Sequence, residues 1–267
     1  MRQSTRLEYE NPMEGFGVES KELLSSQEGQ DGRSPGLIDV DARFNARVRR
    51  ALDIVVSLLA LTVTLPIMLL IAIIIRLDSP GPALFRQTRM TRDRRNGGLS
   101  LSIEGPERRR VFYAGRPFTF LKFRTMYVDA RERFPELYAY RYTDEEIQTI
   151  KFKVSDDPRV TRVGRWLRKS SLDELPNFWN VLTGDMTLCG PRPEIPEMSP
   201  YYTPEQLRKF QVTAGLTGPA QVGGRGELTF QETADIDAQY VKARSLRGDL
   251  KILWQTVVAV VKRRGAE

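Results

Sequence analysis

Two adjacent carboxylates, Asp173 and Glu174, could act as a nucleophile and a metal ligand. They lie in RKSSLDELPNFWNVLTGDM, where Ser171 precedes Glu174 by three residues, the spacing of a capping box. This spacing predicts a helix over residues 172–183 with both acids in its first turn. There the helix dipole favours the ionised carboxylate, so we expect a lowered pKa for Asp173. The alternative is that both acids only complement the dipole.

The second chemical feature is GPRP, residues 190–193, in which Arg192 stands between two prolines. The prolines restrict the turn, and a guanidinium can bind phosphate through two parallel hydrogen bonds. With other cations, Arg192 could surround the acidic pair, as expected where Mg²⁺ and phosphates meet. Those other cations are Lys122, Arg124, Arg168 and Arg225. For any single one of them, a solvated basic surface remains the alternative.

Composition excludes several kinds of chemistry. The 267 residues include one cysteine, Cys189, and no histidine, which excludes disulfide frameworks, His-bearing zinc sites and Ser-His or Cys-His nucleophiles. Catalytic groups must therefore come mainly from carboxylates, lysine, tyrosine or hydroxyls. The 41 Lys and Arg residues exceed the 34 Asp and Glu residues. This excess indicates an anionic partner: nucleic acid, a phosphate-bearing substrate or the inner face of a bilayer.

An apolar run, LLALTVTLPIMLLIAIII over residues 58–75, is interrupted by Pro66. As a straight helix, residues 54–75 would extend about 33 Å, enough to cross a hydrocarbon core. Pro66 lacks the amide that would bond the Thr62 carbonyl, so a kink is expected. The hydroxyls of Thr62 and Thr64 could satisfy the freed backbone groups.

The charges beside this run favour re-entry over a span. Arginines flank both ends, and basic flanks prefer the cytoplasm. Two arms meeting at Pro66 would each be about one leaflet deep. A buried helix of a soluble protein is disfavoured because the run is apolar on all sides. The flanking residues are Arg43, Arg47, Arg49 and Arg50 before the run, and Arg76, Arg86, Arg89, Arg92, Arg94 and Arg95 after it.

The pattern divides the chain into a disordered cytosolic tail, residues 1–42, a membrane helix, residues 43–77, and a cytosolic catalytic domain, residues 78–267. The Gly- and Arg-rich residues 93–116 indicate an inserted hairpin or mobile loop, and residues 118–126 predict a strand. Residues 245–264 form either an interfacial amphipathic helix or a helix packed on the core. Helices are expected over residues 129–138, 160–169, 172–183, 204–211, 230–243 and 246–264.

Two other functions compete with an enzyme that handles phosphates through Asp173. Asp235 and Asp237 form a DxD, the metal-binding signature of many glycosyltransferases that move a bare sugar and release nucleoside diphosphate. Their setting, QETADIDAQYVKA, has helical periodicity rather than the pattern of a strand end, which argues against this function. The third alternative is a non-catalytic membrane-tethered scaffold, which would release no nucleotide.

Several separated motifs occur in an order that resembles the bacterial sugar transferases, the monotopic phosphoglycosyl transferases. These motifs are RPFTFLKFRTM, SDDPRVTRVGRWLRKSSLDELPNFWNVLTGDM, GPRPE, AGLTGPAQVGGRG and LRGDLKILWQT. The resemblance covers residues 47–264 and implies an α+β, mostly helical monotopic membrane protein of the small form. It implies a re-entrant helix hairpin broken at Pro66, interfacial amphipathic helices and a small β element. The implied location is the cytoplasmic face of the bacterial inner membrane, with the bilayer and anionic lipids rather than nucleic acid as partners, and a homodimer is left open.

The resemblance also implies a reaction. Asp173 would attack the β-phosphate of a nucleoside diphosphate sugar, with UDP-sugars as the expected class, and nucleoside monophosphate would leave. Undecaprenyl phosphate would then take the phosphosugar from the enzyme, the initiating step of exopolysaccharide, O-antigen or glycoconjugate assembly. Glu174 is implied as the Mg²⁺ ligand, Arg192 matches the arginine of GPRP, and Arg168 matches a basic position of the family. Lys122, Arg124 and Arg225 fall in motifs that line the same pocket.

The chain departs from the family pattern at two turns. Ala214 stands where the family usually has a proline before Gly215, so we expect a looser turn there. Leu65 precedes Pro66 where many members have serine, which makes Thr64 the nearest hydroxyl. The insertion is also longer than in the smallest members, and the four spanning helices of the large members are absent.

Overall fold

The computed structural model describes residues 35–92, 101–103, 112–151, 154, 156–224 and 227–261. The chain forms two compact units, Met1–Phe44 and Asn45–Glu267. Helix α2 (Pro35–Asp78) begins in the first unit, and the description below concerns the second. Residues 1–34 of the expected tail lie outside the described residues. Residues 35–42 are helical, so the helix begins before the boundary expected at residue 43.

The described β structure consists of two-stranded sheets. The strand expected over residues 118–126 is β4, which ends at Phe123, and the Arg124 amide still donates to the Ala83 carbonyl at 2.8 Å. The expected inserted hairpin is confirmed for the residues described there, and residues 93–100 and 104–111 lie outside the description. The pairs are antiparallel β1 (Leu84–Thr91) with β4 (Arg116–Phe123), antiparallel β2 (Leu101–Ile103) with β3 (Phe112–Ala114), and parallel β5 (Met186–Cys189) with β6 (Ala214–Thr217).

Short helices surround the strands. The helices expected at residues 160–169, 230–243 and 246–264 are α5 (Arg162–Ser170), α8 (Phe230–Lys242) and α9 (Leu246–Val261). The stretch expected as one helix at residues 129–138 is divided, and the helix expected at residues 204–211 is a 3-10 helix over residues 206–211. The other elements are α3 (Ala130–Arg133), η1 (Pro135–Tyr138), α4 (Asp144–Thr149), η2 (Leu172–Glu174), α6 (Asn177–Thr183), η3 (Pro196–Tyr201), η4 (Gln206–Gln211) and α7 (Pro219–Gly224).

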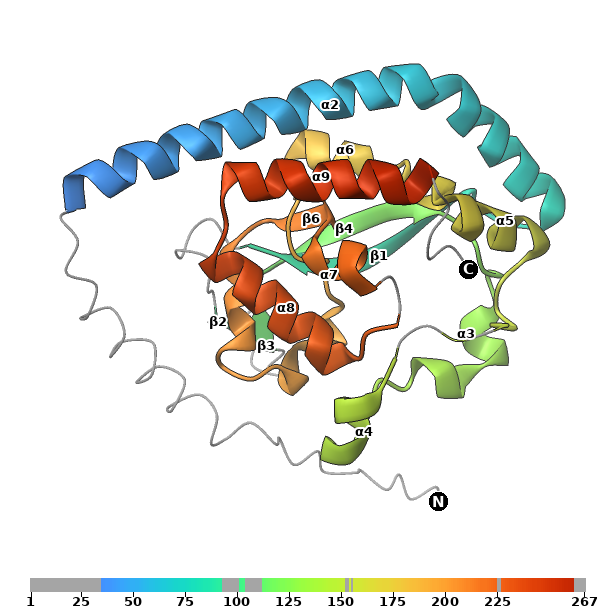
Figure 1. Cartoon of the computed structure of the whole chain (residues 1–267). Helices are drawn as coiled ribbons and strands as arrows, with labels where there is room; N and C mark the ends of the chain where they lie inside the picture. Colours follow the sequence, from blue (N-terminus) through green and yellow to red (C-terminus); the bar gives the residue numbers. More distant parts are fainter. Residues whose placement is uncertain are drawn as a thin grey trace. The chain divides into compact units, whose positions relative to one another are not determined.

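Helix α2 is continuous through Pro66, so the expected break is wrong and is replaced by a bend, visible in Figure 1. Proline kinks a helix without ending it when neighbouring turns keep their hydrogen bonds. The hydroxyls of Thr62 and Thr64 donate to the carbonyls of Leu58 and Ala60, at 2.8 and 2.7 Å, rather than to the Thr62 carbonyl. The helix is long and apolar enough to cross a membrane, and only 11% of its most apolar window is buried.

The first arm of α2 is attached to the rest of the unit by polar contacts. Asp53 is 5% exposed, and its Oδ1 accepts from the Leu188 amide at 2.8 Å. Arg50 donates to the carbonyls of Val181 and Leu182, at 2.7 and 2.6 Å, which completes the hydrogen bonding of the C-terminal end of α6. These contacts hold α2 beside α6, and α9 lies along it as well (Figure 1).

The second arm of α2 is attached by apolar packing. Ile71 and Ile75 are buried against Phe123 and Leu167, whereas residues between the two attachments, such as Val63 at 64% exposure, face outward. Helix α9 has the same double character, because Leu253 packs on the core while Trp254 is 68% exposed. The unit therefore carries an exposed apolar surface on α2 and α9, which in a protein marks an interaction site.

Candidate active site

The acidic pair lies in the turn that joins α5 to α6. Ser171 ends α5 with left-handed torsions, φ 56° and ψ 16°, and its amide donates to the Arg168 carbonyl at 3.2 Å. The Ser171 side chain caps no amide of η2, and α6 begins only at Asn177. The expected capping box is therefore wrong. An N-cap residue needs extended torsions, and Ser171 has left-handed ones because it closes the preceding helix.

Asp173 is a buried carboxylate surrounded by charges. Its pKa is raised to about 6, because burial and the neighbouring Glu174 raise it by more than the cations of Lys122 and Arg168 lower it. The expected lowering of this pKa is wrong because desolvation outweighs the cations, and the short 3-10 turn offers little dipole. Burial also lowers the pKa of Lys122 to about 8, and Asp173 opposes that shift. An ionised but poorly solvated carboxylate of this kind is suited to nucleophilic attack.

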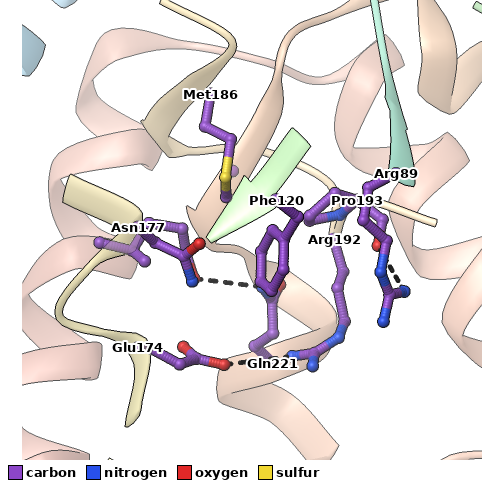
Figure 2. Close-up of a pocket in the computed structure, with 10 residues that line it drawn as sticks. Arg89, Phe120, Glu174, Asn177, Met186, Arg192, Pro193 and Gln221 are labelled. Atoms are coloured by element: carbon purple, nitrogen blue, oxygen red, sulfur yellow. Dashed lines mark hydrogen bonds and ion pairs between the residues drawn. The ribbon is translucent and has the colours of Figure 1, made fainter. Parts of the chain in front are cut away.

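Glu174 and Arg192 meet at a small pocket. Figure 2 shows their side chains pointing toward each other, with 3.9 Å between Glu174 Oε1 and Arg192 Nη1. The Arg192 side chain is 50% exposed, so its guanidinium is accessible to an anion. Asp173 does not line this pocket, although its neighbour Glu174 does. The other lining residues include Arg89, Phe120, Asn177, Met186 and Gln221.

The turns GPRP and AGLTG pack backbone against backbone. The Gly190 amide donates to the Thr217 carbonyl at 2.9 Å, and the Gly215 amide donates to the Pro191 carbonyl at 2.8 Å. A Cβ on Gly215 would lie 2.2 Å from the Gly190 nitrogen, so only glycine fits. The Ala214 amide donates to Thr91 Oγ1 at 3.2 Å, a bond that proline could not make. The turn is therefore held at Ala214 rather than loosened as expected.

The structure brings three of the five expected cations to the acidic pair. Lys122 and Arg168 act on Asp173, and Arg192 faces Glu174. Arg168 Nε also donates to Thr125 Oγ1 at 3.1 Å, which ties α5 to the end of β4.

Arg124 and Arg225 are not brought to the pair in this way. Arg124 is 5% exposed, and its guanidinium donates to the carbonyls at the end of α2. These are the carbonyls of Ile75 at 3.3 Å, Ser79 at 2.7 Å and Pro80. Arg124 thus completes the hydrogen bonding of the α2 terminus. Arg225 lies outside the described residues.

Two amides of the pocket were not anticipated from the sequence. Asn177 is 1% exposed, and within the described part of the chain neither its Oδ1 nor the buried Oε1 of Gln221 has a hydrogen-bond partner. Unpartnered buried oxygens in a pocket indicate groups that a ligand can satisfy. Asn177 follows Glu174 by three residues, a spacing that places side chains on the same helix face. The sequence offers no comparable signal for Gln221.

The DxD residues lie on a helix, as their periodicity indicates, and each carboxylate contacts a side chain of η4. Asp235 Oδ1 accepts from Gln206 Nε2 at 2.7 Å, and the fully buried Asp237 lies 3.0 Å from Lys209 Nζ. Neither carboxylate is therefore placed as a glycosyltransferase DxD would be.

The pocket beside Glu174 offers oxygen ligands of the number and kind with which proteins commonly hold Mg²⁺. Among the described residues, no three acidic, histidine or cysteine side chains form a metal cluster. Mg²⁺ is commonly held by one or two protein oxygens together with substrate phosphates. Glu174 and the unpartnered Oδ1 of Asn177, both lining the pocket, provide such a set.

Comparison with known proteins points to one family. The family model described as bacterial sugar transferase matches residues 44–97 and 100–263. The chain is 42% identical over 223 residues to the UDP-glucose:undecaprenyl-phosphate glucose-1-phosphate transferase of Caulobacter vibrioides. This alignment covers 80% of this chain and 69% of the relative. It is 33% identical over 224 residues to the undecaprenyl-phosphate galactose phosphotransferase of Salmonella typhimurium. That alignment covers 84% of this chain and 42% of the relative, so the chain spans less than half of that protein's length.

Proposed function

Because the chain belongs to the bacterial sugar transferase family, we propose that it transfers a phosphosugar from a nucleoside diphosphate sugar to undecaprenyl phosphate. The name of the Caulobacter vibrioides relative supports a UDP-sugar as donor, and both relatives' names support undecaprenyl phosphate as acceptor. We propose that this transfer is the initiating step of exopolysaccharide, O-antigen or glycoconjugate assembly. The observation that carries the proposal is Asp173, a buried carboxylate whose pKa of about 6 leaves it ionised near neutral pH beside the Glu174–Arg192 pocket.

In the first step an Asp173 carboxylate oxygen attacks the β-phosphorus of the donor. The bond from that phosphorus to the bridging oxygen breaks, nucleoside monophosphate leaves with the electron pair, and an acyl phosphate carrying the sugar remains on Asp173. Arg192 binds the diphosphate, and Lys122 and Arg168 hold Asp173 in its charged form. Mg²⁺, held by Glu174 and Asn177, would supply neutralisation of the diphosphate charge.

In the second step a phosphate oxygen of undecaprenyl phosphate attacks the same phosphorus. The bond between this phosphorus and the Asp173 carboxylate oxygen breaks, the Asp173 carboxylate is restored with the electron pair, and undecaprenyl diphosphate sugar is released. Two steps allow the soluble donor to depart before the lipid acceptor arrives. The apolar surface on α2 and α9 supports a location at the cytoplasmic face of the inner membrane, with α9 lying in the interface.

A panel of nucleotide sugars offered with undecaprenyl phosphate tests the function. We expect one or more UDP-sugars to yield nucleoside monophosphate together with undecaprenyl diphosphate sugar. Release of nucleoside diphosphate would contradict the proposal and indicate transfer of a bare sugar. The absence of any nucleotide release across the panel would favour a scaffold.

The rate of the first step should depend on the ionisation of Asp173. Its raised pKa means that the carboxyl is protonated below pH 6 and ionised above it, so monophosphate release should fall to about a tenth at pH 5. Lys122→Met removes a cation that lowers this pKa, so the midpoint should move to higher pH. The exposed Lys169→Met on α5 should leave the midpoint in place. Single-turnover rates from pH 4.5 to 8.5 measure this, and an unmoved midpoint in Lys122→Met would contradict it.

We also propose that α2 re-enters the cytoplasm. Its two arms are attached to the same compact unit, which supports both ends lying on one side of the membrane. In a Cys189→Ser background, single cysteines at the exposed Arg47 and Arg86 should both be labelled only from the cytoplasmic side. Labelling of Arg47→Cys from outside would indicate a span. Pro66→Leu should shift some molecules toward that span, because the helix hydrogen bonds become continuous.

A further inference from the structure

A cluster of charged and polar side chains lies beneath the turn that carries Arg192. Its centre is the pair of Lys209 on η4 and Asp237 on α8, whose side chains are 2% and 0% exposed and whose Nζ and Oδ2 are 3.0 Å apart. The cluster, called the Lys209 cluster below, consists of Arg89, Glu194, Tyr202, Lys209 and Asp237.

The Lys209 cluster is balanced in charge, and its members lie close together. The Tyr202 hydroxyl donates to Glu194 Oε2 at 2.9 Å and accepts from Lys209 Nζ at 3.0 Å. Lys209 Nζ lies 4.0 Å from Glu194 Oε2, and Arg89 Nη1 lies 3.7 Å from Glu194 Oε1. Two cations therefore neutralise two carboxylates. Burying such groups costs more free energy than an apolar core would, which suggests a role other than stability.

The cluster holds the backbone of the turn directly after Arg192. Arg89 Nη1 donates to the Pro193 carbonyl at 3.2 Å, and the Glu194 carbonyl accepts from the Met90 amide at 2.8 Å. Burial raises the pKa of Asp237, and Lys209 and the backbone amide of Arg192 act on the same carboxylate to lower it. The Arg192 side chain is the exposed group that this fixed backbone directs toward Glu174, as Figure 2 shows.

We propose that Lys209 is a positioning residue that fixes the GPRPE turn and thereby aims Arg192 at the donor diphosphate. This inference rests on the proposed function, in which Arg192 binds that diphosphate. Lys209 cannot reach a substrate itself, because its ammonium is buried between two aromatic rings. Its Nζ lies 5.0 Å from the centre of the Tyr202 ring and 5.8 Å from that of the Phe210 ring. Without Lys209, the described cluster would hold two carboxylates, Glu194 and Asp237, against the one cation of Arg89, and the uncompensated carboxylate would displace the turn.

A double-mutant cycle between Lys209 and Arg192 tests the proposal. The wild type, Lys209→Met, Arg192→Gln and the double variant are compared by kcat/KM for monophosphate release from a UDP-sugar. With Arg192 present, Lys209→Met should lower kcat/KM by about tenfold or more, and in the Arg192→Gln background by less than about twofold. Where Arg192→Gln turnover is too slow to measure, the Kd for UDP completes the same cycle.

The control is Lys242→Met. Lys242 on α8 pairs with Glu205, just before η4, so this exposed ion pair joins the same region and should change kcat/KM by less than about twofold. If Lys209→Met does not fold, Lys209→Met/Asp237→Asn, which leaves Arg89 and Glu194 in balance, replaces it. An equal loss in both Arg192 backgrounds would overturn the proposal. An unchanged rate in Arg192→Gln alone would instead show that Arg192 has no part in the proposed reaction.

Discussion

Asp173→Asn should abolish turnover, with a loss of at least about 10⁴-fold in kcat, because an amide cannot form the acyl phosphate. Asp185→Asn is the matched control. Asp185 lies in the same segment and pairs with Arg116 at 2.6 Å on the partly exposed surface, away from the acidic pair. It should lose less than about threefold. Both variants are measured by monophosphate release with donor and undecaprenyl phosphate present.

Unfolding measurements separate loss of the nucleophile from loss of the fold. The folded-state pKa of Asp173 is raised from its ordinary 3.8 to about 6. The stability that its protonated form contributes is therefore present below pH 4 and lost as pH rises through 6. Asp173→Asn should thus unfold at a higher temperature than the wild type at pH 8. An inactive variant that is less stable than the wild type at pH 8 would contradict this view of the site.

Removal of Mg²⁺ should have the second large effect. Excess chelator should stop turnover, and Glu174→Gln should lower kcat/KM by about 100-fold while raising the Mg²⁺ concentration needed for half-maximal rate. The physical reason is that the Glu174 carboxylate lies 3.9 Å from Arg192, the residue that we propose binds the diphosphate. Glu136→Gln, an exposed acid on η1, should leave both values unchanged. Full activity in excess chelator would remove the metal from the mechanism.

Local sequence motifs were enough to select Asp173, Glu174 and Arg192 as candidate site residues. They were not enough to predict the pKa of Asp173. A capping box is a pattern of residue types, and Ser171 matches it while adopting the torsions of a helix C-terminus. The pKa of Asp173 depends on burial against other elements, which the spacing of charges along the chain does not report. Thr143 and Glu146 do form a capping box, and the short helix α4 that they begin was missed.

Contacts between residues far apart in the sequence account for most of the remaining differences between the sequence-based predictions and the structure. Arg124 and Lys122 stand two residues apart in one motif, yet Arg124 completes the end of α2 while Lys122 faces Asp173. The parallel pairing of β5 with β6 brings GPRP onto AGLTG, and the order of the motifs alone does not show this contact. Periodicity did identify α8, which places Asp235 and Asp237 on a helix as expected.

The central claim is that Asp173 carries the phosphosugar, and intact mass spectrometry with the donor alone tests it most directly. The enzyme is incubated with a UDP-sugar and no lipid, and its mass and the released monophosphate are measured together. We predict about one equivalent of monophosphate and an added phosphosugar mass that maps to a peptide containing Asp173, absent from Asp173→Asn and retained in Asp185→Asn. Monophosphate that appears only after undecaprenyl phosphate is added, with turnover persisting in Asp173→Asn, would contradict the account.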